Sequence, residues 1–260
     1  MRRSVIALML FLLPAANALG HENTATSADI ALDEKLGQTI PASAAFRDEN
    51  GRKVGLGDLF DKPTIIAPVY LHCTHTCPML LTGLAQTLGK MDMVKPGKDY
   101  RVVALSFDDR ETPAIAREKK PNYIRAVGKP FPEGAWTFLT GNAANIKAFM
   151  DSVGFKFQRD GEDFSHPVAL IIVAPGGKVV RYLYGTSFLP FNVTMALNEA
   201  AQGKVGSTTS KVLNYCFSYD PLKKSYVFNV LRVVGTVMVL FVVSFFAYLM
   251  LSTKKKRGTA

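Results

Sequence analysis

Two cysteines separated by three residues are the side chains in this sequence best suited to chemistry. Cys73 and Cys77 lie within the stretch Tyr70–Pro78. On the first turn of a helix, residues i and i+4 share a face with Cβ atoms about 5–6 Å apart, and a helix N-terminus favours a thiolate. Two neighbouring thiolates bind a soft metal ion such as Cu(I), or the pair forms a disulfide. A structural disulfide or two buried thiols is the alternative that the pair leaves open.

The segments on either side of the cysteines predict a strand followed by a helix. Thr64–Leu71 is an apolar run of strand length, typical of a strand covered on both faces. Met79–Met91 carries apolar residues at helical spacing. We therefore expect the cysteines at the C-terminal end of a central strand, where α/β proteins place ligand sites. Their spacing is not the Cys-x-x-Cys of thioredoxin-type redox motifs.

The order of the remaining predicted elements indicates the fold class. An Asn-Gly turn within residues 45–54 predicts two short strands. The other expected elements are strands at 100–107 and 135–140, helices at 113–127 and 143–153, a hairpin of strands 168–173 and 179–184, and a closing helix at 190–201. β-α-β units followed by an antiparallel hairpin and a final helix predict an α/β, thioredoxin-like fold, a central mixed sheet flanked by helices.

A histidine is placed to complete a metal site with the cysteines. His166 stands directly before Pro167 and opens the predicted strand 168–173. In a thioredoxin-like order, the loop entering this strand faces the cysteine-bearing turn, and Pro167 is a candidate for a cis peptide bond there. An imidazole at that position would give Cys73, Cys77 and His166 as a set able to hold Cu(I) or Cu(II). A hydrogen-bonded loop histidine is the alternative.

These residues resemble the Sco/SenC family of membrane-tethered copper proteins that help assemble cytochrome c oxidase. The resemblance covers about residues 40–202. It rests on three segments, which are His72-Cys73-x-x-x-Cys77-Pro78, Val103-Ala104-Leu105-Ser106-Phe107-Asp108 running to Glu111-Thr112-Pro113, and Phe164-Ser165-His166 before a Pro-Gly-Gly hairpin. The resemblance implies that both cysteines and His166 bind copper.

The chain departs from the usual pattern of that family in three ways. Thr74 stands where the family usually has proline after the first cysteine, and His75 stands where an acidic residue is common. The predicted membrane anchor is C-terminal, whereas the usual anchor is N-terminal. We expect the two residue changes to tune metal affinity and thiol pKa, and the anchor to change only the tethering.

Further residues near the cysteines are candidate auxiliary groups. On a helix, His75 would point away from the face that the cysteines share, and we expect both His72 and His75 to be solvated or to support a ligand. Cys216 lies in an aromatic segment beside the predicted membrane helix. It is a candidate extra thiolate, with a lipid or dimer contact or a plain packed cysteine as alternatives. Asp108 and Asp109 end a strand near the site, with helix capping as the alternative.

The two ends of the chain predict export and membrane anchoring. Residues 1–18 have the basic start, apolar stretch and Ala-x-Ala ending of a cleaved signal peptide. The run at 229–251 predicts one transmembrane helix, followed by a basic cytoplasmic tail at 252–260. Between these ends we expect a flexible leader at 19–40, the copper-binding domain at 41–202 and a linker at 203–228. The chain is thus expected to be a single-pass cell-membrane protein whose domain lies on the periplasmic or other extracytoplasmic side.

The charge of the chain argues against a nucleic-acid partner. The 260 residues carry a formal net charge of +10. Seven positive charges lie at the two ends, in Arg2, Arg3, Arg232 and the run 254–257, and subtracting these seven from ten leaves +3. That value is ordinary for a soluble domain, so nothing indicates nucleic-acid binding.

Three functional hypotheses follow. The resemblance implies a copper metallochaperone, not an enzyme, that delivers copper to the dinuclear copper centre of a cytochrome c oxidase subunit by ligand exchange. It would need a periplasmic thiol reductant, because a disulfide offers copper no thiolate. The alternative is a membrane-tethered thiol-disulfide oxidoreductase acting on the cysteines of the oxidase or of other exported proteins. A copper or redox sensor ranks last, because the tail at 252–260 is too short for an output module.

Overall fold

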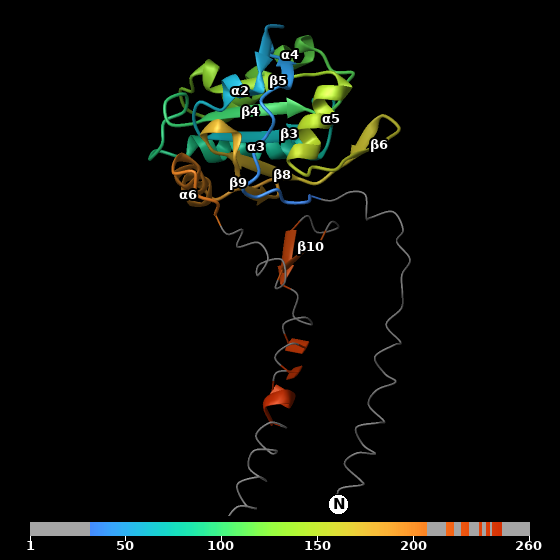
Figure 1. The fold of residues 1–260 in the computed structure, drawn as a ribbon, viewed down its shortest axis with the longest axis vertical. Coiled ribbons are helices and arrows are strands. Elements are labelled where there is room, and N and C mark those ends of the chain that lie inside the picture. The colour runs from blue at the N-terminus through green and yellow to red at the C-terminus, as the bar shows by residue number, and fades with distance from the viewer. Residues whose placement is uncertain are drawn as a thin grey trace, which may run out of the picture. The chain divides into compact units, whose positions relative to one another are not determined.

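The computed structural model describes residues 32–206, 217–220, 225–228, 234–235, 238–239 and 241–245. The chain divides into two compact units, one ending at Val205 and the other beginning at Gly206. The first unit contains the whole predicted α/β domain (Figure 1). The predicted signal peptide at 1–18, Cys216 and the tail at 252–260 lie outside the described residues.

The first unit is built from strands and helices that alternate along the chain. Its strands are β1 (Ala45–Arg47), β2 (Lys53–Gly55), β3 (Thr64–Val69), β4 (Arg101–Ser106), β5 (Trp136–Leu139), β6 (Gln158–Asp160), β7 (Asp163–Ser165), β8 (Ala169–Val173) and β9 (Val179–Tyr184). Its helices are α2 (Leu56–Leu59), α3 (Thr76–Gly89), α4 (Pro113–Ala126), α5 (Ala143–Ser152) and α6 (Pro190–Ala201), with short 3-10 turns η2 (Glu133–Ala135) and η3 (Pro175–Gly177). Each strand and helix predicted from the sequence between Ala45 and Ala201 is present.

The five long strands form one mixed sheet in the order β5-β4-β3-β8-β9. Strand β3 is the central strand. It pairs parallel with β4, with Ile66 opposite Val103, and antiparallel with β8, with Ile66 opposite Ile171. Strands β4 and β5 are parallel, and β8 and β9 form the predicted antiparallel hairpin. The fold class predicted for the domain, a central mixed sheet flanked by helices, is confirmed.

Strand β3 and helix α3, which flank the cysteine loop, are both packed into the core. Every residue of β3 is buried, and helix α3 directs its apolar side chains to the same core. Gly83 of α3 lies so close to the loop before α6 that an added Cβ would be 1.9 Å from the Thr186 carbonyl oxygen. That approach requires glycine, and it brings the loop after β9 against the helix that carries Cys77.

Residues 32–40, predicted as part of a flexible leader, instead pack on the domain. The backbone N–H of Gly37 donates to the Val179 carbonyl, and that of Asp33 donates to the Gly154 carbonyl. Ile40 is buried in the core. The expectation of flexibility to residue 40 is therefore wrong for this part, because apolar residues such as Ile40 gain more by burial than a solvated leader would.

A hairpin that the sequence analysis did not predict stands before β8. Strands β6 and β7 pair antiparallel, with Asp160 opposite Asp163. Most of its residues are exposed, but Phe164 is buried against Tyr70 and Phe107. The hairpin ends at Ser165, so the next residue along the chain is His166.

The second unit contains an antiparallel pair of strands within the predicted linker. Strands β10 (Phe217–Asp220) and β11 (Ser225–Phe228) pair with Phe217 opposite Phe228. Their aromatic residues favour extended structure. Of the predicted membrane segment at 229–251, only short pieces are described. Within the described parts of the chain, no helix has the length and apolar character needed to cross a membrane.

Candidate metal centre

The loop between β3 and α3 holds both cysteines, but only one of them is helical. Helix α3 begins at Thr76, so Cys77 is its second residue and Cys73 lies in the preceding loop. Both cysteines lie at the expected transition from strand to helix, but only Cys77 is on the first turn of α3. The Cys73 sulfur instead accepts hydrogen bonds from the backbone N–H groups of His75, at 3.4 Å, and Cys77, at 3.5 Å. It satisfies an N–H group that helix α3 leaves free, because the N-cap residue His75 contributes no side-chain cap.

His166 lies beside Cys77, as the predicted fold order required. Its Nε2 atom is 3.8 Å from the Cys77 sulfur, although 89 residues separate the two in sequence. The Nδ1–H group donates to the Pro167 carbonyl oxygen at 2.8 Å. Since Nδ1 carries the hydrogen, the lone pair of the neutral imidazole is on Nε2, the atom that faces the sulfur. A ring held in this way is the usual state of a metal-binding histidine.

The peptide bond before Pro167 is trans, since the described residues contain no cis peptide bond. The cis bond considered for this position is therefore absent. The backbone brings His166 to the cysteines without it, and the imidazole is fixed by its own hydrogen bond to the Pro167 carbonyl. Burial lowers the pKa of His166, which favours the neutral ring that a metal ion needs.

The two cysteines differ in the protonation state that their surroundings favour. A hydrogen bond with the Cys77 thiol lowers the pKa of Cys73; burial opposes this effect, and the Tyr70 hydroxyl and the N–H groups of Cys77 and His75 reinforce it. The same hydrogen bond, together with burial, raises the pKa of Cys77. These surroundings favour the thiolate on Cys73 and the protonated thiol on Cys77 in the reduced pair.

This asymmetry predicts selective alkylation of the reduced protein at mildly acidic pH. A lowered pKa keeps Cys73 as thiolate at pH 6, where an ordinary thiol of pKa about 8.5 is almost entirely protonated and unreactive. Limiting iodoacetamide at pH 6 should therefore label Cys73 well before Cys77, as peptide mass spectrometry can measure. Equal labelling of both residues, appearing only as the pH approaches 8.5, would contradict the assignment.

The spacing of Cys77 and His166 fits two ligands of one metal ion. Bonds of about 2.3 Å to thiolate and about 2.0 Å to imidazole, the values typical of zinc, place two ligands of a trigonal site about 3.7 Å apart. The observed separation is 3.8 Å. Within the part of the chain that the structure describes, no three His, Cys, Asp or Glu side chains already form a metal-binding group.

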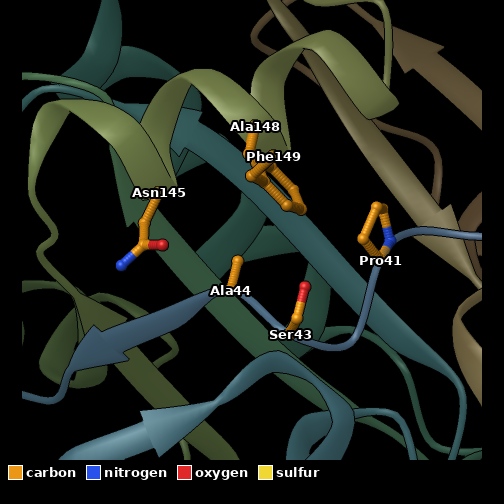
Figure 2. A pocket seen from close by; sticks show the side chains of 6 residues that line it. All are labelled: Pro41, Ser43, Ala44, Asn145, Ala148 and Phe149. Atoms are coloured by element: carbon orange, nitrogen blue, oxygen red, sulfur yellow. The ribbon is translucent and has the colours of Figure 1, made fainter.

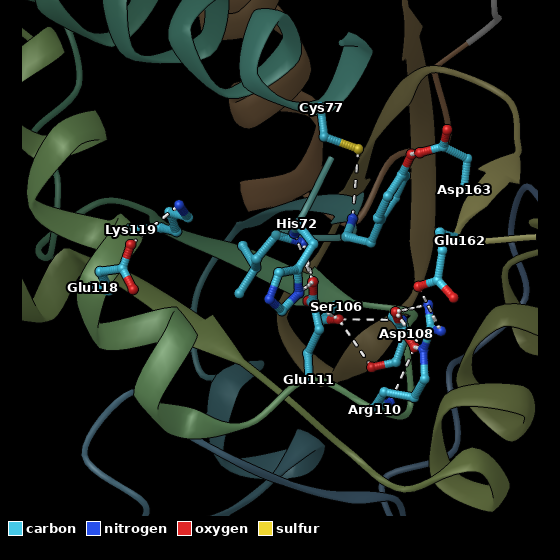
Figure 3. Close-up of polar contacts among 12 residues, drawn as sticks. His72, Cys77, Ser106, Asp108, Arg110, Glu111, Glu118, Lys119, Glu162 and Asp163 are labelled. Carbon is cyan, nitrogen blue, oxygen red and sulfur yellow. Dashed lines mark hydrogen bonds and ion pairs between the residues drawn. The ribbon is translucent and has the colours of Figure 1, made fainter. Parts of the chain in front are cut away.

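A buried carboxylate holds the start of the cysteine loop. Glu111 Oε1 accepts hydrogen bonds from the backbone N–H of Leu71, at 2.6 Å, and of His72, at 2.8 Å. The Ser106 hydroxyl donates to Oε2 at 2.6 Å. Figure 3 shows the Glu111 carboxylate beside the side chains of Ser106 and His72. This role was not predicted from the sequence, because an acidic residue just before a helix is typically a solvated cap.

The two histidines near Cys73 form hydrogen bonds with Glu111 and Thr74. His72 Nδ1–H donates to Glu111 Oε1 at 3.0 Å, and its ring is largely exposed. His75 is exposed, with Nδ1 3.0 Å from the Thr74 hydroxyl oxygen. Their proposed support of the site stays a prediction, as does the role of Cys216.

Asp108 belongs to an ion-pair network with two arginines. It accepts hydrogen bonds from Arg110, at 2.9 Å, and from Arg159 of β6, at 3.0 Å. Burial raises the pKa of Asp108, but the bonds from the two arginines outweigh that effect and the net pKa is lowered. Asp109 also pairs with Arg159, at 2.8 Å. The network ties the loop after β4 to the β6–β7 hairpin.

A small pocket elsewhere in the domain offers no comparable chemistry. It lies between helix α5 and the segment before β1 (Figure 2), and its lining residues are Pro41, Ser43, Ala44, Asn145, Ala148 and Phe149. Its amide side chain is already engaged, because Asn145 Nδ2 donates to the Ala45 carbonyl at 2.7 Å. The cysteine and histidine cluster is therefore the candidate functional site.

Several known proteins are similar to this chain. The family model described as SCO1/SenC matches residues 34–221, and no curated protein shows a significant match. A structure from Aquifex aeolicus VF5, described as a candidate electron transfer protein, is similar at 26% identity and a TM-score of 0.58, covering 66% of this chain and 97% of that one. Arabidopsis thaliana ScoI with copper bound is similar at 20% identity and a TM-score of 0.50, covering 65% and 99%. BsSco, described as a Sco-family cytochrome c oxidase assembly protein with a disulfide switch, is similar at 21% identity and a TM-score of 0.51, covering 66% and 98%.

Proposed function

This chain belongs to the SCO1/SenC family, and on that premise we propose that it is a copper metallochaperone. It delivers copper to the dinuclear copper centre of a cytochrome c oxidase subunit. Two relatives of the same fold support the assignment. The Arabidopsis thaliana structure has copper bound, and BsSco is described as a member of a family of oxidase assembly proteins.

The observation that carries the proposal is the meeting of Cys77 and His166. The Cys77 sulfur and the free lone pair of His166 Nε2 face each other at 3.8 Å, and Cys73, next to Cys77, supplies a thiolate. Two sulfur ligands and one imidazole suit copper as Cu(I) or Cu(II), because thiolates are soft ligands and imidazole accepts both states. Cys77 gives up its proton when the metal binds, so copper uptake releases a proton.

The chemistry of delivery is exchange of ligands between two proteins. Cys73 and Cys77 must be reduced, because a disulfide has no thiolate to offer. A periplasmic thiol reductant is therefore a required partner. The predicted export signal at 1–18 and membrane helix at 229–251 complete the proposal: the domain works outside the cytoplasm, tethered to the membrane near its oxidase partner, with the C-terminus in the cytoplasm.

The unequal cysteines favour a second candidate function, thiol-disulfide exchange. The Cys73 thiolate would attack a disulfide of the oxidase subunit or of another exported protein, displacing one sulfur and forming a mixed disulfide. Cys77, after losing its proton, would then attack Cys73 and release the partner as a dithiol. The two electrons come from the Cys73–Cys77 pair, which ends as a disulfide. Here His166 has no necessary role, which is why the metallochaperone ranks first.

A transfer experiment separates the two functions. The reduced full-length protein is loaded with Cu(I) and mixed with the oxidase-subunit domain that holds the dinuclear copper centre. This acceptor domain is supplied without copper, with its own cysteines either reduced or oxidised. We expect copper to move to the reduced acceptor while Cys73 and Cys77 stay reduced. Reduction of the oxidised acceptor without any copper transfer would instead establish the oxidoreductase and overturn the chaperone.

A further inference from the structure

The imidazole of His166 is packed among aromatic rings. It lies edge-on to Tyr70, with centroids 5.9 Å apart, and against Phe107, with centroids 5.1 Å apart. Phe164, two residues earlier in the chain, contacts the same two rings, at 5.0 and 5.3 Å. Residues i and i+2 of an extended strand face the same side, which explains how Phe164 and His166 meet the same rings. The position of Phe164 therefore helps to set that of the imidazole.

Arg159 of β6 fastens Phe164 to the loop after β4. Its guanidinium carbon lies 4.5 Å from the centre of the Phe164 ring, a distance typical of a cation–π contact. The same guanidinium donates to Asp108 Oδ1 at 3.0 Å and to Asp109 Oδ1 at 2.8 Å. The Asp108 side chain is only 3% exposed, so this charge-assisted bond is partly shielded from water and contributes more than an exposed ion pair does.

Asp108 directly follows Phe107 in the chain, so Arg159 connects the two segments whose rings contact the imidazole. We propose that Arg159 is a positioning residue that holds the His166 imidazole through the two phenylalanine rings. Its guanidinium closes the β6–β7 hairpin against the loop after β4, and the rings keep Nε2 directed to the cysteine pair. The inference deepens the proposed function, on which it rests in taking His166 as a copper ligand.

Two other side chains of the hairpin each bind one partner in the domain. Glu162, whose side chain is 94% exposed, pairs with Arg110 at 3.2 Å, and Asp163 accepts a hydrogen bond from the Tyr70 hydroxyl at 3.1 Å. Exposed ion pairs contribute little stability. Arg159, in contrast, binds two carboxylates and a buried ring. Its loss should therefore loosen the segment that follows β7 more than the loss of Arg110 does.

The tautomer of His166 tests the inference in protein that holds no copper. The full-length, reduced protein is labelled with ¹⁵N-histidine and studied by NMR at about pH 8, above the ordinary imidazole pKa of about 6.5. The bond to the Pro167 carbonyl keeps the hydrogen on Nδ1, so the two ring nitrogens should give widely separated resonances. Of the four histidines in the chain, His166 is identified by the resonances that His166→Ala loses.

In Arg159→Ala, the loosened ring should exchange between its two tautomers, and the two resonances should move toward each other. Arg159→Lys keeps the charge but not the planar group over the Phe164 ring, so it should give an intermediate shift. Changes in contacts around a metal-binding histidine typically lower metal affinity by about 10–100-fold. We expect Cu(I) affinity to fall about tenfold in Arg159→Ala, as competition with a chromophoric Cu(I) chelator measures.

Arg110→Ala is the matched control. Arg110 also binds Asp108, at 2.9 Å, but its removal leaves the cation of Arg159 over the Phe164 ring. The His166 resonances and the Cu(I) affinity should therefore match those of the unaltered protein. Unchanged resonances in a folded Arg159→Ala would overturn the inference, as would an equal effect of Arg110→Ala.

Two further comparisons keep the test decisive. The fluorescence of the buried Trp136 shows whether each variant is folded, and if Arg159→Ala is not, Arg159→Lys is judged by the same criteria. If the unaltered protein binds no copper, the proposed function falls, while the resonances of the copper-free protein still decide the role of Arg159.

Discussion

Replacing Cys77 by serine should abolish tight Cu(I) binding by the reduced protein. A serine hydroxyl is a hard, protonated oxygen donor that Cu(I) does not favour, and the change removes the sulfur that faces His166 Nε2. We expect affinity to fall by a factor of about a thousand or more, equivalent to about 4 kcal/mol. Competition with a chromophoric Cu(I) chelator measures the effect. Cys73→Ser should behave in the same way, because it removes the second thiolate.

Cys216→Ser is the control for these cysteine variants. It removes a thiol from the segment before the predicted membrane helix, and that thiol is not part of the proposed ligand set. Copper affinity should therefore match that of the unaltered protein. A Cys77→Ser variant that kept its affinity, or a Cys216→Ser variant that lost it, would contradict the assignment of the site.

Replacing Glu111 by alanine should cost the domain about 3–5 kcal/mol of stability. The Glu111 side chain is fully buried, and it accepts bonds from the backbone N–H groups of Leu71 and His72 and from the Ser106 hydroxyl. Alanine would leave these donors without their acceptor. Burying a polar group without a hydrogen-bond partner lowers the free energy of unfolding. Urea unfolding followed by the fluorescence of Trp136, the one tryptophan of the chain and fully buried, measures the loss.

Glu118→Ala provides the matched comparison on the neighbouring helix. Glu118 is 67% exposed and pairs with Lys119 at 3.2 Å, and Figure 3 shows that pair away from the network around Glu111. Its removal should change stability by about 0.5 kcal/mol or less. Similar losses for the two variants would show that Glu111 does not anchor the cysteine loop.

Most of the fold could be predicted because its elements carry strong local patterns. Residues 65–69 of β3 are apolar and buried at every position, and β9 and α6 occupy the predicted residues, 179–184 and 190–201. The expected approach of His166 to the cysteines is confirmed by its contact with Cys77, because strand order alone decides which loops meet. The roles of these residues as copper ligands remain predictions.

Other features depend on tertiary contacts that no local pattern encodes. The β6–β7 hairpin is largely polar, and the burial of Phe164 on Tyr70 holds it in place. The position of Cys73 outside α3 depends on where the first helical turn closes, which a spacing of four residues does not determine. The sequence shows Glu111 as one of several carboxylates after β4. Only the fold reveals that it is buried beneath the cysteine loop.

The coordination of copper in the reduced protein shows whether Cys73, Cys77 and His166 bind one metal ion together. X-ray absorption spectroscopy is applied to the Cu(I)-loaded full-length protein and to His166→Ala, with stoichiometry measured for both. We expect one copper bound by two sulfur atoms and one imidazole nitrogen, and loss of that nitrogen in the variant. Identical spectra for the two proteins, or no tightly bound copper in the reduced protein, would contradict the Cys73, Cys77 and His166 site.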